Sequence, residues 1–300
     1  MNRIDTIFGL QTPILFAHRG GALEVPESTI KGFRHAIQNA DTDVLELDVQ
    51  LTQDGQFVVW HGPELHNVRI QGQSDRPKER RRTKIYHYDW QELEGKAWVA
   101  DPEILSTPVH DRDLSKVPGD QDRCLMLLVD FLSLFPDHPL NIEMKKSFER
   151  KINDIDRKGL KHNIKTFIDI LDAAPGNRRI VVASASDDRI DTFREISEER
   201  YPTNLSILEQ LTLQLFTKKM KNRALETSYH ELVSSRRIVE KVHGANGSVF
   251  VFLTEFGPLL PAIDEKIPSQ KEIFDILDRG IDGIMTDRPE SVRKIMDQWE

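Results

Sequence analysis

The feature of this chain that most constrains its fold is a regular alternation of two kinds of segment. Short runs of β-branched and apolar residues alternate with longer segments whose apolar residues recur at helical spacing, such as Ile30, Phe33 and Ile37. This alternation is typical of parallel βα units. Strands are predicted at 14–18, 43–49, 140–145, 179–185, 204–209, 224–228, 248–254 and 282–286.

Eight strands, each followed by a helical segment, predict an α/β fold of the closed (β/α)8 TIM-barrel type. The length of 300 residues suits a single barrel domain. The fifth and sixth predicted strands have the weakest patterns. An open, doubly wound sheet is the alternative fold if either of these two strands is absent.

The stretch after the second predicted strand interrupts the repeat. Residues 50–61 place Asp54-Gly55 between two strand-like runs, which predicts a β-hairpin extending from that strand. Residues 62–120 then form a long insertion, expected to cap the barrel face that carries active sites in barrel enzymes. One domain over 1–300 is therefore predicted, with an insertion at 62–120.

Charge and composition exclude several classes of function. The formal net charge is −8, so we expect no nucleic-acid partner. A basic run at 75–84 would either steer anionic substrates or form a solvated loop. Cys124 is the sole cysteine, and the short apolar pieces near the N-terminus fit neither a signal peptide nor a membrane span. We expect a cytoplasmic protein without stable membrane insertion, and the oligomeric state stays open.

Two predicted strands carry charged residues at alternate positions. Side chains alternate between the two faces of a strand, so Glu46 and Asp48 project to one side, as do Glu143 and Lys145. Three carboxylates at the ends of adjacent strands would repel one another unless a cation neutralised them. An all-oxygen set suits Mg²⁺ or Ca²⁺ better than Zn²⁺. A divalent metal site at Glu46, Asp48 and Glu143 is therefore predicted.

Two histidines are expected beside this site. If Asp54-Gly55 forms a two-residue turn, the numbers of two paired residues in the hairpin add up to 109. His61 then lies directly opposite Asp48 on the same face. His18 ends the first predicted strand, which neighbours the second strand in a barrel. Both histidines would then flank one metal ion.

Six motifs in order along the chain make a family resemblance specific. The chain resembles the glycerophosphodiester phosphodiesterase family from its first predicted strand to its last. The motifs are AHRGG at 17–21, PEST at 26–29, ELDVQLTQDG at 46–55, VVWH at 58–61, NIEMK at 141–145 and DGIMTDRPE at 282–290.

The resemblance implies hydrolysis of a small-molecule phosphodiester that links sn-glycerol 3-phosphate to an alcohol. The matching metal ligands are Glu46, Asp48 and Glu143. The resemblance further implies that the glycerol 2-hydroxyl attacks phosphorus and that water opens the resulting cyclic phosphate. His18 and His61 match the family's acid/base pair, and histidine suits this role because its pKa lies near neutral pH.

Two cationic residues complete the site that the resemblance implies. Arg19 and Lys145 would neutralise phosphoryl oxygens as charge grows in the transition state. Lys145 could instead be a structural partner of Glu143. The chain departs from the family pattern at Gly62, where an aspartate is usual, and at Ala185, where a phenylalanine is usual.

Two other functions are compatible with the sequence. A lysophospholipase D or sphingomyelinase D type of activity shares the barrel and its two-histidine metal site, although the toxin-like relatives are typically secreted and disulfide-bonded. A non-catalytic barrel could instead bind a phosphorylated ligand. The complete set of ligands and histidines favours an enzyme.

Overall fold

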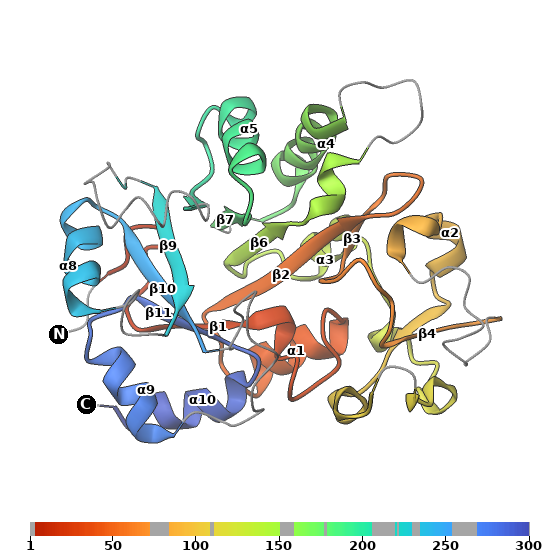
Figure 1. Cartoon of the computed structure of the whole chain (residues 1–300), viewed down its shortest axis with the longest axis horizontal. Coiled ribbons are helices and arrows are strands. Elements are labelled where there is room, and N and C mark those ends of the chain that lie inside the picture. The colour runs from red at the N-terminus through yellow and green to blue at the C-terminus, as the bar shows by residue number, and fades with distance from the viewer. Residues whose placement is uncertain are drawn as a thin grey trace.

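The computed structural model describes residues 4–72, 84–108, 111–150, 159–176, 179–205, 220, 222–229, 235–253 and 269–299. Its core is a closed barrel of parallel strands with helices outside (Figure 1). The barrel strands are β1 Ile14–Ala17, β2 Val44–Leu51, β6 Leu140–Met144, β7 Ile180–Ala183, β8 Thr203–Asn204, β9 Arg223–Ser228, β10 Ser248–Phe252 and β11 Gly283–Thr286. They pair in the order β1-β11-β10-β9-β8-β7-β6-β2, and pairing of β1 with β2 closes the ring.

The predicted TIM barrel is confirmed, including its fifth and sixth strands. β8 pairs with both of its neighbours through Thr203 and Asn204, so the sheet is closed and the open alternative is wrong. The strand is described only to this point, because 206–219 lie outside the described residues. The helix expected after the fifth strand falls in that same range.

Helices cover the outside of the barrel between successive strands. The longer ones are α1 Ile30–Gln38, α3 Leu128–Leu134, α4 Gly159–Ala173, α5 Asp187–Ser197, α8 Arg236–Gly244, α9 Gln270–Leu277 and α10 Pro289–Met296. α1 shows why these helices form. Thr29 caps the first turn of α1 by accepting a hydrogen bond from the Gly32 amide at 3.0 Å, and Phe33, on the apolar face of the helix, packs against the barrel. No helix in the described ranges is long and apolar enough to cross a membrane.

The barrel lumen has an apolar layer below and a polar layer above. Rings from non-adjacent strands meet at its centre, with the Phe16 and Phe250 centroids 4.7 Å apart. The N-terminal segment closes this end, where Phe8 packs on Phe16 at 5.6 Å. The layer comprises Ile7, Phe8, Ile14, Phe16, Val44, Val181, Ala224, Phe250 and Met285. Because this apolar layer fills the lower part of the lumen, the polar layer lies above it, toward the carboxyl ends of the strands.

The hairpin after β2 has a different register from the predicted one. β3, Phe57–Val59, pairs antiparallel with β2 so that Val49 faces Val59, and the Trp60 amide donates to the Asp48 carbonyl at 3.0 Å. Paired residues thus sum to 108, and the prediction that His61 lies directly opposite Asp48 is wrong. The cause is a three-residue turn, 53–55, which Gly55 completes at φ +82°.

Residues between the hairpin and α3 form a small layered unit with its own apolar cluster. It contains the strand pair β4 Val68–Ile70 and β5 Ala97–Val99, the helix α2 Trp90–Leu93, and the 3₁₀ turns η3 Ile85–His87, η4 Pro102–Ser106, η6 Leu114–Lys116 and η7 Gln121–Arg123. The cluster packs against Val58 and Trp60 of the hairpin. Most of the basic run at 75–84 lies outside the described residues.

Candidate active site

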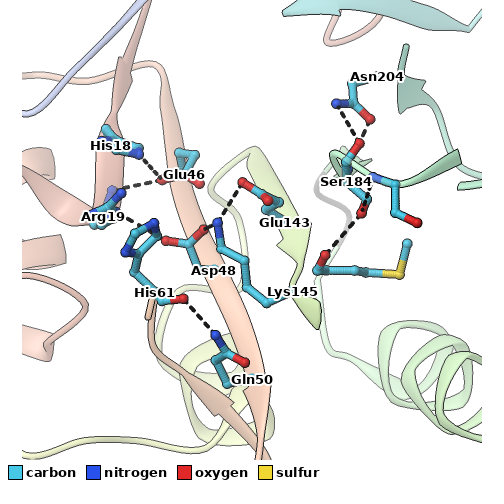
Figure 2. Close-up of polar contacts among 12 residues, drawn as sticks. His18, Arg19, Glu46, Asp48, Gln50, His61, Glu143, Lys145, Ser184 and Asn204 are labelled. Atoms are coloured by element: carbon cyan, nitrogen blue, oxygen red, sulfur yellow. Dashed lines mark hydrogen bonds and ion pairs between the residues drawn. The ribbon is translucent and has the colours of Figure 1, made fainter. Parts of the chain in front are cut away.

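Three carboxylates meet above the apolar layer of the barrel. Glu46 and Asp48 project from β2, and Glu143 from β6, where it lies beside Asp48 in the strand register. One oxygen from each of the three lies within 4.8 Å of the others. Glu46 and Asp48 are 3% and 0% exposed, whereas the Glu143 side chain is 28% exposed toward the mouth. The predicted convergence of these three residues is present in the structure (Figure 2).

Two cationic side chains hold the carboxylates together. Lys145 Nζ lies 2.7 Å from Asp48 Oδ1 and 2.9 Å from Glu143 Oε2. Arg19 Nε lies 3.3 Å from Asp48 Oδ2, and the Arg19 amide donates to Glu46 Oε2 at 2.9 Å. Lys145 therefore does pair with Glu143, as the structural alternative supposed, and it also pairs with Asp48.

The buried acids have strongly divergent proton affinities. Burial and the neighbouring Asp48 charge raise the pKa of Glu46 to about 8. Burial also opposes ionisation of Asp48, but Lys145, His61 and Arg19 together lower its pKa well below the usual range. The raised pKa of Glu46 means that the nearby cationic side chains do not fully neutralise the clustered carboxylates. A further positive charge bound among their oxygens would stabilise all three in the ionised form. This donor set fits a hard divalent cation.

His18 is oriented by a partner from the opposite end of the sequence. Its Nδ1 lies 2.6 Å from Asp287 Oδ1, just after β11, and its Nε2 lies 3.9 Å from Glu46 Oε2. Burial alone would lower the pKa of His18, but Asp287 and Glu46 more than offset it and the pKa is raised. The pKa of Asp287 is lowered by His18 despite burial, so its carboxylate accepts and Nδ1 donates. Nε2 therefore faces the carboxylates.

Arg19 occupies a tight turn at the end of β1. It has a left-handed backbone, at φ 52°, and two glycines follow at φ 79° and φ 97°. A Cβ on Gly20 would come within 3.0 Å of the backbone of α1, so only glycine fits this approach. Arg19 Nη1 also lies 3.3 Å from Glu27 Oε2, and this ion pair fixes the guanidinium beside the carboxylates.

His61 reaches the site from just beyond β3. Gln50 Nε2 donates to the His61 carbonyl at 2.7 Å and holds its backbone next to β2. Figure 2 shows the imidazole facing Asp48, on the same side of the carboxylates as His18 and Arg19. Burial lowers the pKa of His61 to about 3, with help from Arg19 and Lys145 and against the attraction of Asp48. The ring is therefore neutral in this arrangement, although the predicted register was wrong by one residue.

A second polar network joins the ends of β6, β7 and β8 near the site (Figure 2). The Ser184 amide donates to Asn204 Oδ1 at 3.0 Å, and Ser184 Oγ donates to the Met144 carbonyl at 3.1 Å. Arg189 Nε donates to Ser184 Oγ at 2.7 Å from the first turn of α5. Ala185 follows Ser184 and is exposed, so the position where the family usually has a phenylalanine carries only a methyl group.

Sequence reasoning assigned no role to Asp287 or Glu27, which position His18 and Arg19. Asp287 stands in the motif DGIMTDRPE and Glu27 in the motif PEST, two of the six motifs on which the family resemblance depends. Each is an acid in a short loop next to a strand end, which is where barrel enzymes gather functional groups. Their pairing with His18 and Arg19 could not be read from the sequence, because it depends on how the barrel closes.

The fold and the site together define a closed (β/α)8 barrel with a cluster of buried acids at the carboxyl ends of its strands. Residues 18–291 match the Glycerophosphoryl diester phosphodiesterase family, so the chain belongs to that family and is a phosphoric diester hydrolase. It is 24% identical over 293 residues to a glycerophosphodiester phosphodiesterase of Bacillus altitudinis, covering 95% of this chain and 99% of that protein.

Two further proteins show how far the similarity extends. A phosphodiesterase from Oleispira antarctica, solved in complex with the product sn-glycerol-3-phosphate, shares the fold with a TM-score of 0.63 and 19% identity over 95% of this chain and 97% of that one. Lysophospholipase D GDPD1 of Rattus norvegicus is 31% identical over 129 residues, which are 43% of this chain and 35% of that protein.

Proposed function

We propose that this enzyme hydrolyses glycerophosphodiesters to sn-glycerol 3-phosphate and an alcohol, and that it depends on a divalent metal ion. The observation that carries the proposal is the cluster of Glu46, Asp48 and Glu143 with oxygens within 4.8 Å, flanked by two histidines and two cations. The family match and the product named for the Oleispira structure support the same substrate class.

The three carboxylates are the groups that would hold Mg²⁺ or Ca²⁺. Such an ion would supply Lewis-acid polarisation of a phosphoryl oxygen. Arg19 and Lys145 contribute positive charge from opposite sides of Asp48, at 3.3 and 2.7 Å. They would stabilise the negative charge that builds on the remaining phosphoryl oxygens.

The two histidines divide the proton transfers. One takes the proton of the glycerol 2-hydroxyl as its oxygen bonds to phosphorus. The other gives a proton to the alcohol oxygen as the bond from that oxygen to phosphorus breaks. In the second half, water attacks the cyclic phosphate and the same two imidazoles act in reverse, so each ends in its starting state. Asp287 keeps His18 in the tautomer whose Nε2 faces the reaction centre.

The insertion at 62–120 would form a cap that shapes access to this centre within a single domain. Its apolar cluster is anchored on Val58 and Trp60, and Trp60 immediately precedes His61. Trp60 Nε1 donates to the Glu64 carbonyl at 3.1 Å, so the path from β3 into the cap is held rigidly. The cap and His61 are therefore mechanically linked.

A substrate panel tests the proposal directly. Glycerophosphocholine, glycerophosphoethanolamine and a lysophospholipid are each incubated with the enzyme, with Mg²⁺, with Ca²⁺ and with a chelator, and sn-glycerol 3-phosphate is measured. We expect release from the glycerophosphodiesters that the chelator abolishes and either metal restores. Full activity in metal-free enzyme would contradict the metal dependence. Cell fractionation would test the expected cytoplasmic location.

A further inference from the structure

A buried acid on the far wall of the barrel has no role in the chemistry described above. Glu226 lies on β9, is 6% exposed, and accepts from Asn141 Nδ2 of β6 at 2.7 Å. β6 and β9 are not neighbours, because β7 and β8 lie between them in the ring. The hydrogen bond therefore runs across the lumen, and both side chains point inward.

The position of this pair relative to the metal cluster is set by the strand registers. Asn141 pairs with Glu46 and stands two residues before Glu143 on β6, one side-chain level deeper in the barrel. Glu226 stands two residues after Ala224, which belongs to the apolar floor. Asn141 is therefore level with Glu46 in the strand register and one level below Asp48 and Glu143, and Glu226 lies just above the apolar floor.

The pair has hydrogen-bonding capacity that the protein does not use. Asn141 is 1% exposed, and among the described residues its Oδ1 has no hydrogen-bond partner. Burial raises the pKa of Glu226 to about 7, with a further contribution from Glu143 and against the hydrogen bonds from Asn141 and Asn204. Buried polar atoms normally have partners, so an unmet acceptor beside a buried carboxyl at the base of a site indicates a bound polar group.

We propose that Glu226 and Asn141 bind the terminal 1-hydroxyl of the substrate's glycerol moiety. The inference rests on the proposed function, in which the phosphoryl group faces Arg19 and Lys145 and the 2-hydroxyl faces the histidines. The remaining polar group of the glycerol is then the 1-hydroxyl. A hydroxyl can donate its hydrogen to an acceptor such as Asn141 Oδ1, whereas a second anion at this position would be repelled by the Glu226 carboxyl.

This assignment makes Glu226 a specificity residue. A glycerophosphodiester has a free 1-hydroxyl, whereas a 1-acyl lysophospholipid has an ester and a long apolar chain at the same position. The ester cannot donate, so its binding would leave Asn141 Oδ1 without a donor and place an apolar chain against the Glu226 carboxyl in a buried site. Sites built to bind a hydroxyl reject analogues that lack it for this reason. The enzyme would therefore select glycerophosphodiesters over lysophospholipids.

The test compares two phosphodiesters of ethanolamine that differ by one hydroxyl. Glycerophosphoethanolamine has the 1-hydroxyl, and the corresponding diester of propane-1,2-diol lacks it but keeps the attacking 2-hydroxyl. In the wild type, we expect kcat/KM to be about 10- to 100-fold lower for the deoxy substrate. Glu226→Ala should lower kcat/KM for glycerophosphoethanolamine by the same factor and change the deoxy substrate by less than about threefold.

Companion variants separate recognition from folding. Glu226→Gln keeps a hydrogen-bonding group and should retain part of the preference. Thr227→Val alters the next residue of β9, which points out of the lumen, and should leave the preference intact. The preference for glycerophosphoethanolamine over its 1-acyl derivative, measured below the critical micelle concentration, should shrink in Glu226→Ala. If Glu226→Ala does not fold, the wild-type preference and its reduction in Glu226→Gln decide the question.

Several outcomes would overturn the inference. Equal losses on both substrates in Glu226→Ala, or no wild-type preference for the hydroxyl, would show that Glu226 is structural. If the wild type hydrolyses no glycerophosphodiester, the proposed function fails instead. Binding of sn-glycerol 3-phosphate and of its 1-deoxy analogue to the wild type and Glu226→Ala then still tests the hydroxyl site, because calorimetry requires no turnover.

Discussion

His18 and His61 approach the same carboxylates from two regions that are built differently. His18 stands at the seam where β1 meets β11, and its ring is fixed by Asp287 at 2.6 Å within the barrel wall. His61 lies outside the barrel ring, two residues after the end of β3. Gln50 donates to its backbone carbonyl rather than to its ring. In the described part of the chain, the His61 ring has no hydrogen-bond partner of its own.

The difference indicates which part of the molecule controls each histidine. The seam is completed only when the barrel closes, so the orientation of His18 belongs to the core fold. The hairpin is anchored by the apolar cluster that Trp60 shares with the cap, so the orientation of His61 depends on the insertion. Changes in the core should therefore act on His18 and changes in the cap on His61, with Asp48 common to both.

The largest effect is expected where the two regions meet. Asp48→Asn removes the charge that Arg19, Lys145 and a bound cation share, so metal binding should be lost and kcat should fall by about 10⁴-fold or more. Metal content by mass spectrometry and kcat on glycerophosphoethanolamine measure the two effects. Asp130→Asn, at an exposed carboxylate of α3, serves as the control. Normal activity in Asp48→Asn would remove the basis for the metal centre.

Replacing either histidine should have the next largest effect. His18→Ala and His61→Ala should each lower kcat by about 10²- to 10⁴-fold while the metal stays bound. A p-nitrophenyl ester needs little protonation of its leaving group, so the variant that lacks the general acid should lose less on this substrate than the variant that lacks the base. This asymmetry assigns the two roles. Turnover near the wild-type value in His61→Ala would show that the second acid/base lies elsewhere.

A smaller loss should follow from removing the partner of His18 alone. Asp287→Asn keeps a hydrogen-bond acceptor but removes the charge, and kcat should fall by about 10- to 100-fold with KM and metal content unchanged. The double variant Asp287→Asn/His18→Ala should be no slower than His18→Ala, because Asp287 acts through His18. Additive losses in the double variant would mean that Asp287 has a separate function.

The smallest effect is expected at the tip of the cap. Deleting 75–84 removes six lysine or arginine residues and should leave the barrel folded and kcat nearly unchanged. KM should rise by a few fold at low ionic strength and by less at high salt, since long-range attraction of an anionic substrate is screened. Circular dichroism and KM at two salt concentrations check this. An unfolded deletion variant would show that the segment is structural.

The sequence by itself determined the barrel and the acids that meet in its candidate site. Strand and helix periodicities are local properties, so eight βα units could be counted without knowledge of any contact. Alternation along a strand is equally local, and it placed Glu46 beside Asp48 and Glu143 on the lumen face. The closing of strands into a ring then brought these acids together, because parallel strands end at one face.

Only the tertiary structure decided the partners and the exact placement of the histidines. The register of the hairpin depends on one extra residue in its turn. Gly55 adopts a left-handed backbone at φ +82° and forms a three-residue turn in place of the predicted two-residue turn. His18 and Asp287 are 269 residues apart in sequence, and Asn141 meets Glu226 across two intervening strands. Such contacts follow from how the ring closes and how far side chains reach across it, and no local pattern encodes them.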